Sequence, residues 1–94
     1  MNLKGERAAS DIQKEISDII LTEVRDEDLK NVTITYVKVT NDLSYAKIYF
    51  TTLDVENKDK VLKDINAASG FFRTLLADRL DVRHIPELKF IFWR

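Results

Sequence analysis

The chain has 94 residues, which limits it to one small domain, and we expect residues 1–94 to fold together. Hydrophobic residues make up 45% and charged residues 33%, an ordinary globular mixture. The absence of cysteine excludes disulfides and thiolate metal sites, and without an apolar leader or a membrane-length apolar run we expect a soluble cytoplasmic protein that does not enter membranes.

The charge is uneven along the chain, although the net charge is only −1. Residues 1–57 carry seven Lys/Arg and eleven Asp/Glu, a balance of −4. Residues 58–94 carry eight and five, a balance of +3. Such asymmetry can mark a side that faces a partner, but scatter in a short chain explains it equally well.

Residues 6–25 have the pattern of an amphipathic helix. Three- and four-residue spacing places five apolar residues on one stripe: Ala9, Ile12, Ile16, Ile19 and Ile20. Lys14 and Asp18 are spaced to form an i,i+4 ion pair beside it. The polar run at 25–28 ends the pattern and is expected to be a solvated loop.

Residues 32–40 are rich in β-branched residues and predict a strand. The alternation is imperfect, because Val32, Ile34 and Tyr36 share one face while Val37 and Val39 share the other. Either a bulge near Tyr36 resets the phase, or both faces are partly covered.

A second strand is expected over residues 44–53, after a short turn at 41–43. Its alternation predicts three inward residues, Ala46, Ile48 and Phe50, and three outward residues, Tyr45, Lys47 and Tyr49. The two strands should pair as a hairpin.

Residues 57–69 and 71–80 predict two helices. The first has Val61, Leu62, Ile65 and Ala68 on its apolar stripe, and the second has Phe71, Phe72, Leu75, Leu76 and Leu80. Gly70 interrupts them and permits a tight kink or a close backbone approach. Pro86 keeps the next segment out of the helix, and residues 88–93 predict a third strand.

The resulting order, α-β-β-α-kink-α-β, is that of type II KH domains, which bind single-stranded RNA. A KH domain carries a Gly-x-x-Gly loop between two helices, and this chain has Ala68-Ser69-Gly70 in its place. That kink resembles the ribosome-binding factor A family. Further similar segments are Asp11-Ile12-Gln13-Lys14-Glu15-Ile16, Val32-Thr33-Ile34-Thr35, Asp42-Leu43-Ser44-Tyr45-Ala46-Lys47-Ile48-Tyr49, Phe71-Phe72-Arg73 and Arg83-His84-Ile85-Pro86-Glu87-Leu88-Lys89-Phe90.

The resemblance implies an α+β, type II KH-like fold whose three-stranded sheet has helices on one face. It also implies a cytoplasmic factor that binds the immature small (30S) ribosomal subunit, assists late processing of 16S rRNA, and matters most in the cold. Assembly GTPases would be functional partners. We expect a monomer that needs no cofactor and is not an enzyme.

The kink residues Ala68, Ser69 and Gly70 are the first candidates for RNA contact. Small side chains leave backbone amides open to phosphate at the positive end of the following helix. A simple junction that lets two helices pack is the alternative. Arg73 and Arg79 follow in that helix as candidate phosphate forks, or as ordinary surface ion pairs with Asp78 or Asp81.

Six further cations are candidate phosphate contacts, although each one alone is better explained as an ordinary solvated charge: Lys4, Arg7, Lys14, Lys60, Lys63 and Arg83. His84 is the only histidine and cannot form a metal cluster by itself. Four aromatic residues, Tyr36, Tyr45, Tyr49 and Trp93, could stack on bases if exposed, but we expect them to pack in the core or cover the sheet. A protein–protein module without RNA affinity is the alternative function.

Overall fold

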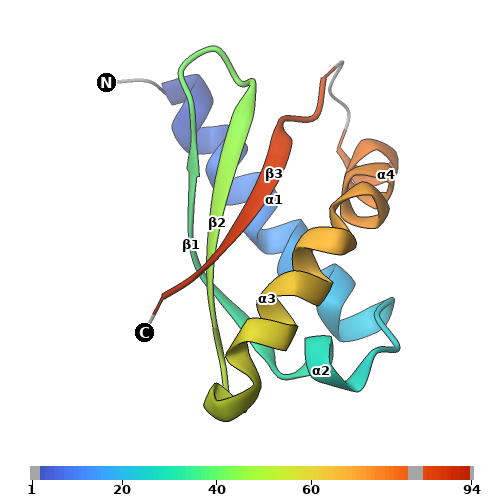
Figure 1. Ribbon diagram of the computed structural model, residues 1–94. Coiled ribbons are helices and arrows are strands. Elements are labelled where there is room, and N and C mark those ends of the chain that lie inside the picture. The colour runs from blue at the N-terminus through green and yellow to red at the C-terminus, as the bar shows by residue number, and fades with distance from the viewer. Residues whose placement is uncertain (1–2, 81–83, 94) are drawn as a thin grey trace.

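The computed structural model describes residues 3–80 and 84–93, with main chain only for Leu3 and Lys4. In chain order the elements are α1 (Leu3–Thr22), α2 (Glu27–Lys30), β1 (Val32–Val39), β2 (Tyr45–Thr52), the 3-10 helix η1 (Val55–Asn57), α3 (Lys58–Ala67), α4 (Ser69–Arg79) and β3 (Glu87–Phe92) (Figure 1). The predicted order is confirmed, with two short helices added to it.

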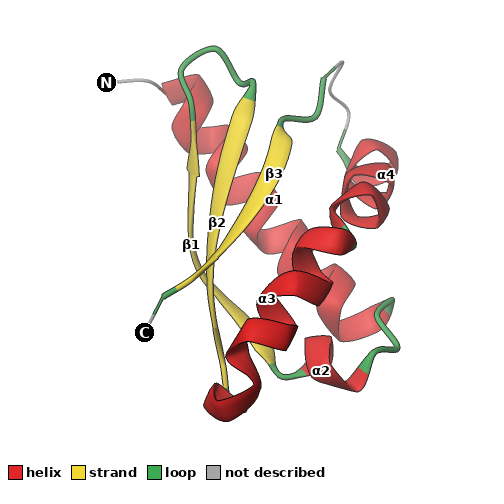
Figure 2. Cartoon of the chain, viewed as in Figure 1, coloured by secondary structure: helices red, strands yellow, loops and turns green. Residues whose placement is uncertain are grey.

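The three strands form one sheet in the order β1-β2-β3. β1 and β2 pair antiparallel as the predicted hairpin, while β2 and β3 pair in parallel. The connection between the parallel strands runs through α3 and α4, and the helices lie on one side of the sheet (Figure 2). The predicted α+β architecture, with a helix-covered face and an open face, is confirmed.

A β-bulge in β1 explains its broken alternation. Ile34 pairs with Phe50 and Tyr36 pairs with Tyr49, so Thr35 is the extra residue between two successive partners. Ile34 and Val37 therefore both face the core, and Tyr36 faces solvent. Of the two explanations left open by the sequence, the bulge is correct, but the assignment of Tyr36 to the face of Ile34 was wrong.

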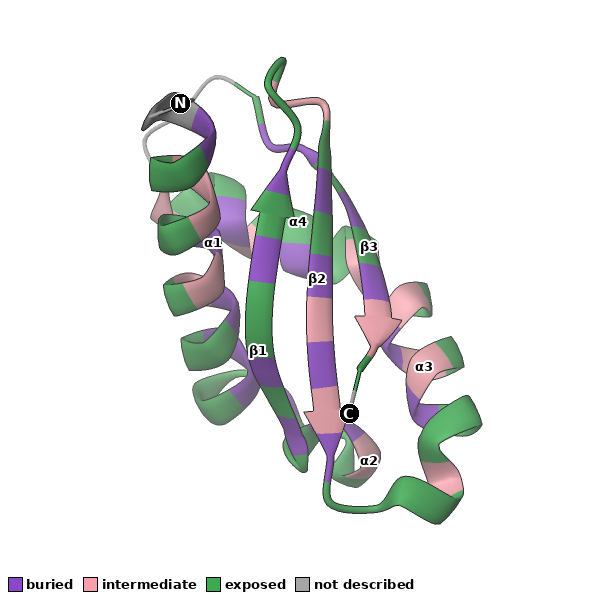
Figure 3. Ribbon diagram, turned by 90° about the vertical axis from the view of Figure 1, so that its left-hand side faces the viewer, coloured by how far each residue is buried: buried purple, intermediate pink, exposed green. Residues whose placement is uncertain are grey.

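The core lies between the covered face of the sheet and the inward faces of the helices. Its largest fully buried side chains include Phe50 from β2, Phe72 from α4 and Phe90 from β3. The rings of Phe72 and Phe90 lie 5.3 Å apart, which ties α4 to the last strand. The predicted inward residues of β2 are buried, as is the predicted stripe of α1 except Ala9, which is half-buried against the core. Exposed residues alternate with buried ones along the strands (Figure 3).

Only Arg25 and Asp26 form the solvated loop that the polarity of residues 25–28 suggested, because Glu27 and Asp28 begin α2. Asp26 accepts a hydrogen bond from the amide of Asp28 (2.9 Å) and caps α2, and Leu29 of that helix is buried. The loop prediction is wrong for Glu27 and Asp28, because one buried leucine within a charged run is enough to anchor a single helical turn. α1 accordingly ends at Thr22, earlier than expected.

Two other local predictions were wrong. Lys14 and Asp18 do not pair, because Asp18 accepts a hydrogen bond from Arg79 of α4 instead. Phe71 is not a core residue, since one helical step rotates it about 100° from Phe72 and leaves it 45% exposed. Both errors came from treating a helix as isolated from the elements packed against it.

The hairpin turn is built around one carboxylate. Asp42 accepts hydrogen bonds from the Ser44 hydroxyl, the Ser44 amide (3.1 Å) and the Thr40 hydroxyl (2.8 Å). These bonds favour the charged form and lower the pKa of Asp42 to about 2. Leu43 has a φ of 62°, the left-handed conformation that a branched side chain adopts only when its surroundings enforce it.

Across the two described ranges, no helix is both long and apolar enough to cross a membrane.

Candidate nucleic-acid interface

The junction between α3 and α4 consists of one residue, Ala68, which ends α3 and begins α4. The amide of Ala68 donates back to the carbonyl of Asp64 (3.1 Å), and the amide of Phe72 donates to the carbonyl of Ala68 (3.1 Å). No side chain caps the start of α4. The amides of Ser69, Gly70 and Phe71 therefore find no acceptor among the described residues and are available to a ligand.

Gly70 is exposed, and nothing in the fold requires it to be a glycine. Its φ is not positive, and a Cβ placed on it would meet no atom within 4 Å. Neither a left-handed turn nor a close approach by another backbone explains this residue, and the helix-packing alternative does not hold for it. The missing side chain instead leaves the main chain open to solvent at the start of α4.

Arg73 lies one turn after Gly70. One guanidinium nitrogen donates to the carbonyl of Ile85 (3.1 Å), which orients the side chain across the segment that precedes β3. The side chain is exposed, and no carboxylate in the described part of the chain pairs with it. Lys63, one turn before Ala67 on α3, is likewise exposed without an ion pair there.

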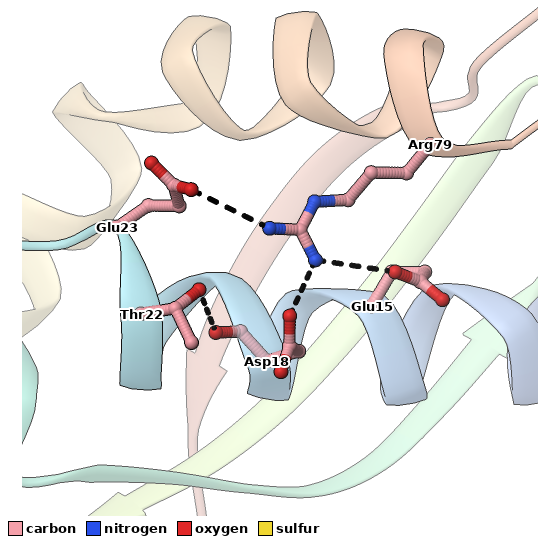
Figure 4. Close-up of polar contacts among 5 residues, drawn as sticks. All are labelled: Glu15, Asp18, Thr22, Glu23 and Arg79. Carbon is pink, nitrogen blue, oxygen red and sulfur yellow. Dashed lines mark hydrogen bonds and ion pairs between the residues drawn. The ribbon is translucent and has the colours of Figure 1, made fainter.

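Arg79 is placed quite differently (Figure 4). Its guanidinium contacts three carboxylates of the α1 region: Glu15 at 3.3 Å, Asp18, and Glu23 at 3.7 Å. The hydrogen bond with Asp18, followed by that with Glu15, raises the pKa of Arg79. Its charge is balanced within the fold, by partners on α1 and not by the neighbouring Asp78.

Lys60 is also held by acids. Its ammonium pairs with Asp28, and this hydrogen bond raises the pKa of Lys60. Carboxylate oxygens of Asp26, Asp28 and Asp64 lie within 4.8 Å of one another, so Lys60 offsets a cluster of like charges. A phosphate would be repelled on this side of the junction.

A shallow hollow lies beside the junction. It is lined by Glu23, Val24, Arg25, Asp26, Leu29, Asp64, Ala67, Ala68 and Phe71. Two of these residues, the exposed Arg25 and the half-exposed ring of Phe71, were not singled out from the sequence. The position of Phe71 directly after Gly70 could have marked it as part of the junction. The position of Arg25 beside the junction depends on where α1 ends, which the sequence did not predict.

The remaining predicted cations do not join the junction. Arg7 and Lys14 are exposed on α1, whose N-terminal end lies beside the β1–β2 turn, away from α2 and the start of α4 (Figure 1). Arg83 and the side chain of Lys4 fall outside the described residues. Among the described residues, Ala68, Ser69, Gly70, Lys63 and Arg73 therefore lie at or next to the junction without an ion pair, whereas Lys60 and Arg79 are held by carboxylates.

The four candidate aromatic residues cover the open face of the sheet, which is one of the two uses expected from the sequence, and the other expected use, packing in the core, is wrong. Tyr36, Tyr45 and Trp93 are exposed, and Tyr49 is half-buried between its neighbours.

The fold and the junction define this chain as a small α+β domain with a three-stranded sheet, in which one residue joins the helices α3 and α4. The family model for ribosome-binding factor A matches residues 4–92, and the chain belongs to that family. The chain is 41% identical over 87 residues to a ribosome-binding factor A of Francisella philomiragia, covering 93% of this chain and 61% of the relative. It is 46% identical over 90 residues to that of Malacoplasma penetrans, covering 96% and 78%.

Solved structures of this family have the same fold. The crystal structure of ribosome-binding factor A from Thermus thermophilus superposes with a TM-score of 0.87 over 96% of each chain, at 21% identity. A homology model of the Thermus thermophilus factor, fitted into a cryo-electron microscopy map of its complex with the 30S subunit, gives a TM-score of 0.66 at 23% identity, covering 88% of this chain and 92% of that one. The chain spans about three fifths of the length of the Francisella relative.

Proposed function

We propose that this protein binds the immature small ribosomal subunit and assists late maturation and processing of 16S rRNA, without bond-making chemistry of its own. The observation that carries the proposal is Gly70, a glycine that the fold does not need, exposed among unpaired amides. Family membership supports the choice of partner, as does the Thermus factor that was fitted into a 30S complex.

The junction offers an RNA backbone three kinds of donor. The amides of Ser69, Gly70 and Phe71, which have no acceptor among the described residues, lie at the positive end of α4, which favours an anion. Arg73 adds a guanidinium with free N–H groups, and Lys63 adds a point charge on the preceding helix. Phosphates approach over Lys63 and Arg73 and avoid the hollow beside Ala68, which Asp26 and Asp64 make acidic.

Several finer points belong to the same proposal. The domain acts in the cytoplasm as a monomer, holds rRNA near the decoding region in an immature arrangement, and matters most in the cold. Assembly GTPases act in the same pathway. Arg7 and Lys14 on α1 add contacts to a separate rRNA segment. Arg79 and Lys60 are left out of the interface, because carboxylates already engage them.

The test compares Gly70→Leu with Ala77→Leu, which adds a similar side chain at another exposed position of α4. Co-sedimentation with immature small subunits should weaken at least about tenfold for Gly70→Leu, a loss of about 1.4 kcal/mol. The same variant should melt no lower than the parent, since leucine is the better helix former. Ala77→Leu should bind as the parent does.

Equal binding by a folded Gly70→Leu variant would remove the junction from the mechanism. Nuclease treatment separates the alternative function. Association that disappears with the RNA supports RNA binding, whereas nuclease-resistant capture of a single protein supports a protein–protein module.

A further inference from the structure

The open face of the sheet carries a row of three lysines. Lys38 of β1 pairs in register with Lys47 of β2, and Lys47 pairs with Lys89 of β3. All three are exposed, and none forms an ion pair with a carboxylate of the described chain. With adjacent strands about 4.8 Å apart, the three lysines occupy neighbouring positions across the three strands.

This row is unfavourable for the isolated protein. Like charges directly opposite one another on neighbouring strands destabilise a sheet. One carboxylate, Glu87, lies on the same face, next to Tyr45 and one row beyond Lys89. Glu6 of α1 lines a hollow with Lys38 at the β1 edge. Neither acid reaches a lysine of the row within salt-bridge distance, so the positive charge is left for a partner.

An aromatic row lies directly beside the lysines. The Tyr36 and Tyr49 rings are 5.8 Å apart, and the Trp93 ring meets Tyr49 edge-on at 6.2 Å. Tyr36 is 57% and Trp93 is 64% exposed, and together with Thr35 and Tyr49 they line a shallow hollow. The Thr35 bulge is what turns Tyr36 onto this face.

From this arrangement we propose that the open sheet face is a second binding surface, and that its ligand is single-stranded RNA. Phosphates lie along Lys38, Lys47 and Lys89, and bases stack on the rings of the neighbouring row, about 7 Å away along the strands. Two rows of different chemistry, one cationic and one aromatic, are what an unpaired strand requires. A duplex hides its bases and cannot use the rings.

This surface is separate from the helix junction. No helix of residues 3–80 and 84–93 covers the open face, whereas the junction lies among the helices on the other side of the sheet (Figures 2 and 3). One molecule can therefore hold two RNA segments at once, one on each side. The inference rests on the proposed function only in taking the ribosomal RNA as the source of the strand.

Trp93 makes the proposal directly measurable, because it is the only tryptophan of the chain. A mixed-sequence single-stranded RNA dodecamer should quench Trp93 emission saturably, and the same dodecamer annealed to its complement should not. The salt dependence of RNA affinity should depend on the number of lysines in the row. The variant Lys38→Gln/Lys47→Gln should lower the slope of log K against log salt by about 1.4, at about 0.7 per lost contact with a single strand.

The matched control is Lys30→Gln/Lys58→Gln, which removes the same charge elsewhere and should leave the slope unchanged. Labelled dodecamer that binds while Trp93 emission stays constant would overturn the inference, as would equal slopes for the two double variants. Loss of a nuclease-resistant protein partner in Lys38→Gln/Lys47→Gln, with RNA binding intact, would also overturn it and assign the face to a protein.

The two proposals fail separately. Quenching that persists in Gly70→Leu, while that variant no longer sediments with small subunits, supports the sheet face as an independent site. If Trp93 emission does not change with RNA, and Gly70→Leu no longer sediments with small subunits, the sheet-face proposal is wrong and the proposed function stands. If Gly70→Leu still binds small subunits and RNA still quenches Trp93, only the role of the junction is contradicted.

Discussion

The two faces of the sheet are made by alternate residues of the same strands, yet they follow different rules. On β2 the inward Ala46, Ile48 and Phe50 are fully buried, and their sizes and positions are explained by the helices that cover them. On the open face Lys47 lies between two other lysines, and exposed rings flank that row. The packing of the fold explains the residues of the covered face, whereas the row of like charges on the open face destabilises the sheet.

The helix α4 repeats this contrast along its length. At its C-terminal end Arg79 is surrounded by carboxylates of α1, an arrangement that holds two helices together. At its N-terminal end a Cβ on Gly70 would meet no atom within 4 Å, and the Gly70 amide has no acceptor among the described residues. Residues that form no stabilising contact within the fold are the ones that indicate a binding partner.

The largest effect is expected for Phe50→Ala, compared with Tyr49→Ala one position away. Removing a fully buried ring should lower the free energy of unfolding by about 3–5 kcal/mol, and the loss for the half-buried Tyr49 should be clearly smaller. Urea unfolding measures both. RNA affinity of the folded fraction should fall for Tyr49→Ala and stay constant for Phe50→Ala, and the reverse ranking would contradict the division of the two faces.

Arg79→Leu should lower the melting temperature, because it leaves Glu15, Asp18 and Glu23 close together with no cation between them. High salt should reduce this loss by screening the three carboxylates. Association with small subunits, measured below the melting transition, should not change. Arg73→Leu serves as the counterpart, and it should weaken that association. An Arg79→Leu variant that binds as poorly as Arg73→Leu would place Arg79 in the interface.

Asp42→Asn should change the response of the hairpin to acid. The pKa of Asp42 is lowered to about 2 from 3.8, so its charge stabilises the folded state above about pH 4, and this stabilisation is lost as the pH falls towards 2. The variant should be less stable at neutral pH and show a flatter decline over that acid range. Urea midpoints at several pH values test this, with Asp11→Asn as the control for an exposed carboxylate. Parallel curves for parent and variant would contradict it.

The same turn decides which residues reach which face. A slip of one residue in the β1–β2 register would exchange the lysine row for core residues. Hydrogen–deuterium exchange of the β2 amides at pH 3 should therefore rise more in Asp42→Asn than in the parent.

Strong apolar periodicity made much of this molecule predictable. The stripe of α1, the inward face of β2 and the bulge near Tyr36 were all visible as spacing in the sequence. The partners of Arg79 and Lys60 were not, because residues 61 and 32 positions away along the chain supply their nearest carboxylates. The lysine row was hidden for the same reason, since Lys38, Lys47 and Lys89 become neighbours only once three strands are in register.

The smallest effect on stability is also the one that separates the two faces most cleanly. Lys47→Glu places a carboxylate between Lys38 and Lys89, which replaces two cross-strand repulsions with attractions and should raise the free energy of unfolding by about 0.2–1 kcal/mol. RNA affinity should fall by more than about tenfold, since a phosphate contact becomes a repulsion. Urea unfolding and Trp93 quenching measure the two quantities on one sample. Higher stability together with weaker RNA binding is expected only if the lysine row binds a polyanion. A variant that loses both stability and RNA binding would show that Lys47 supports the sheet itself.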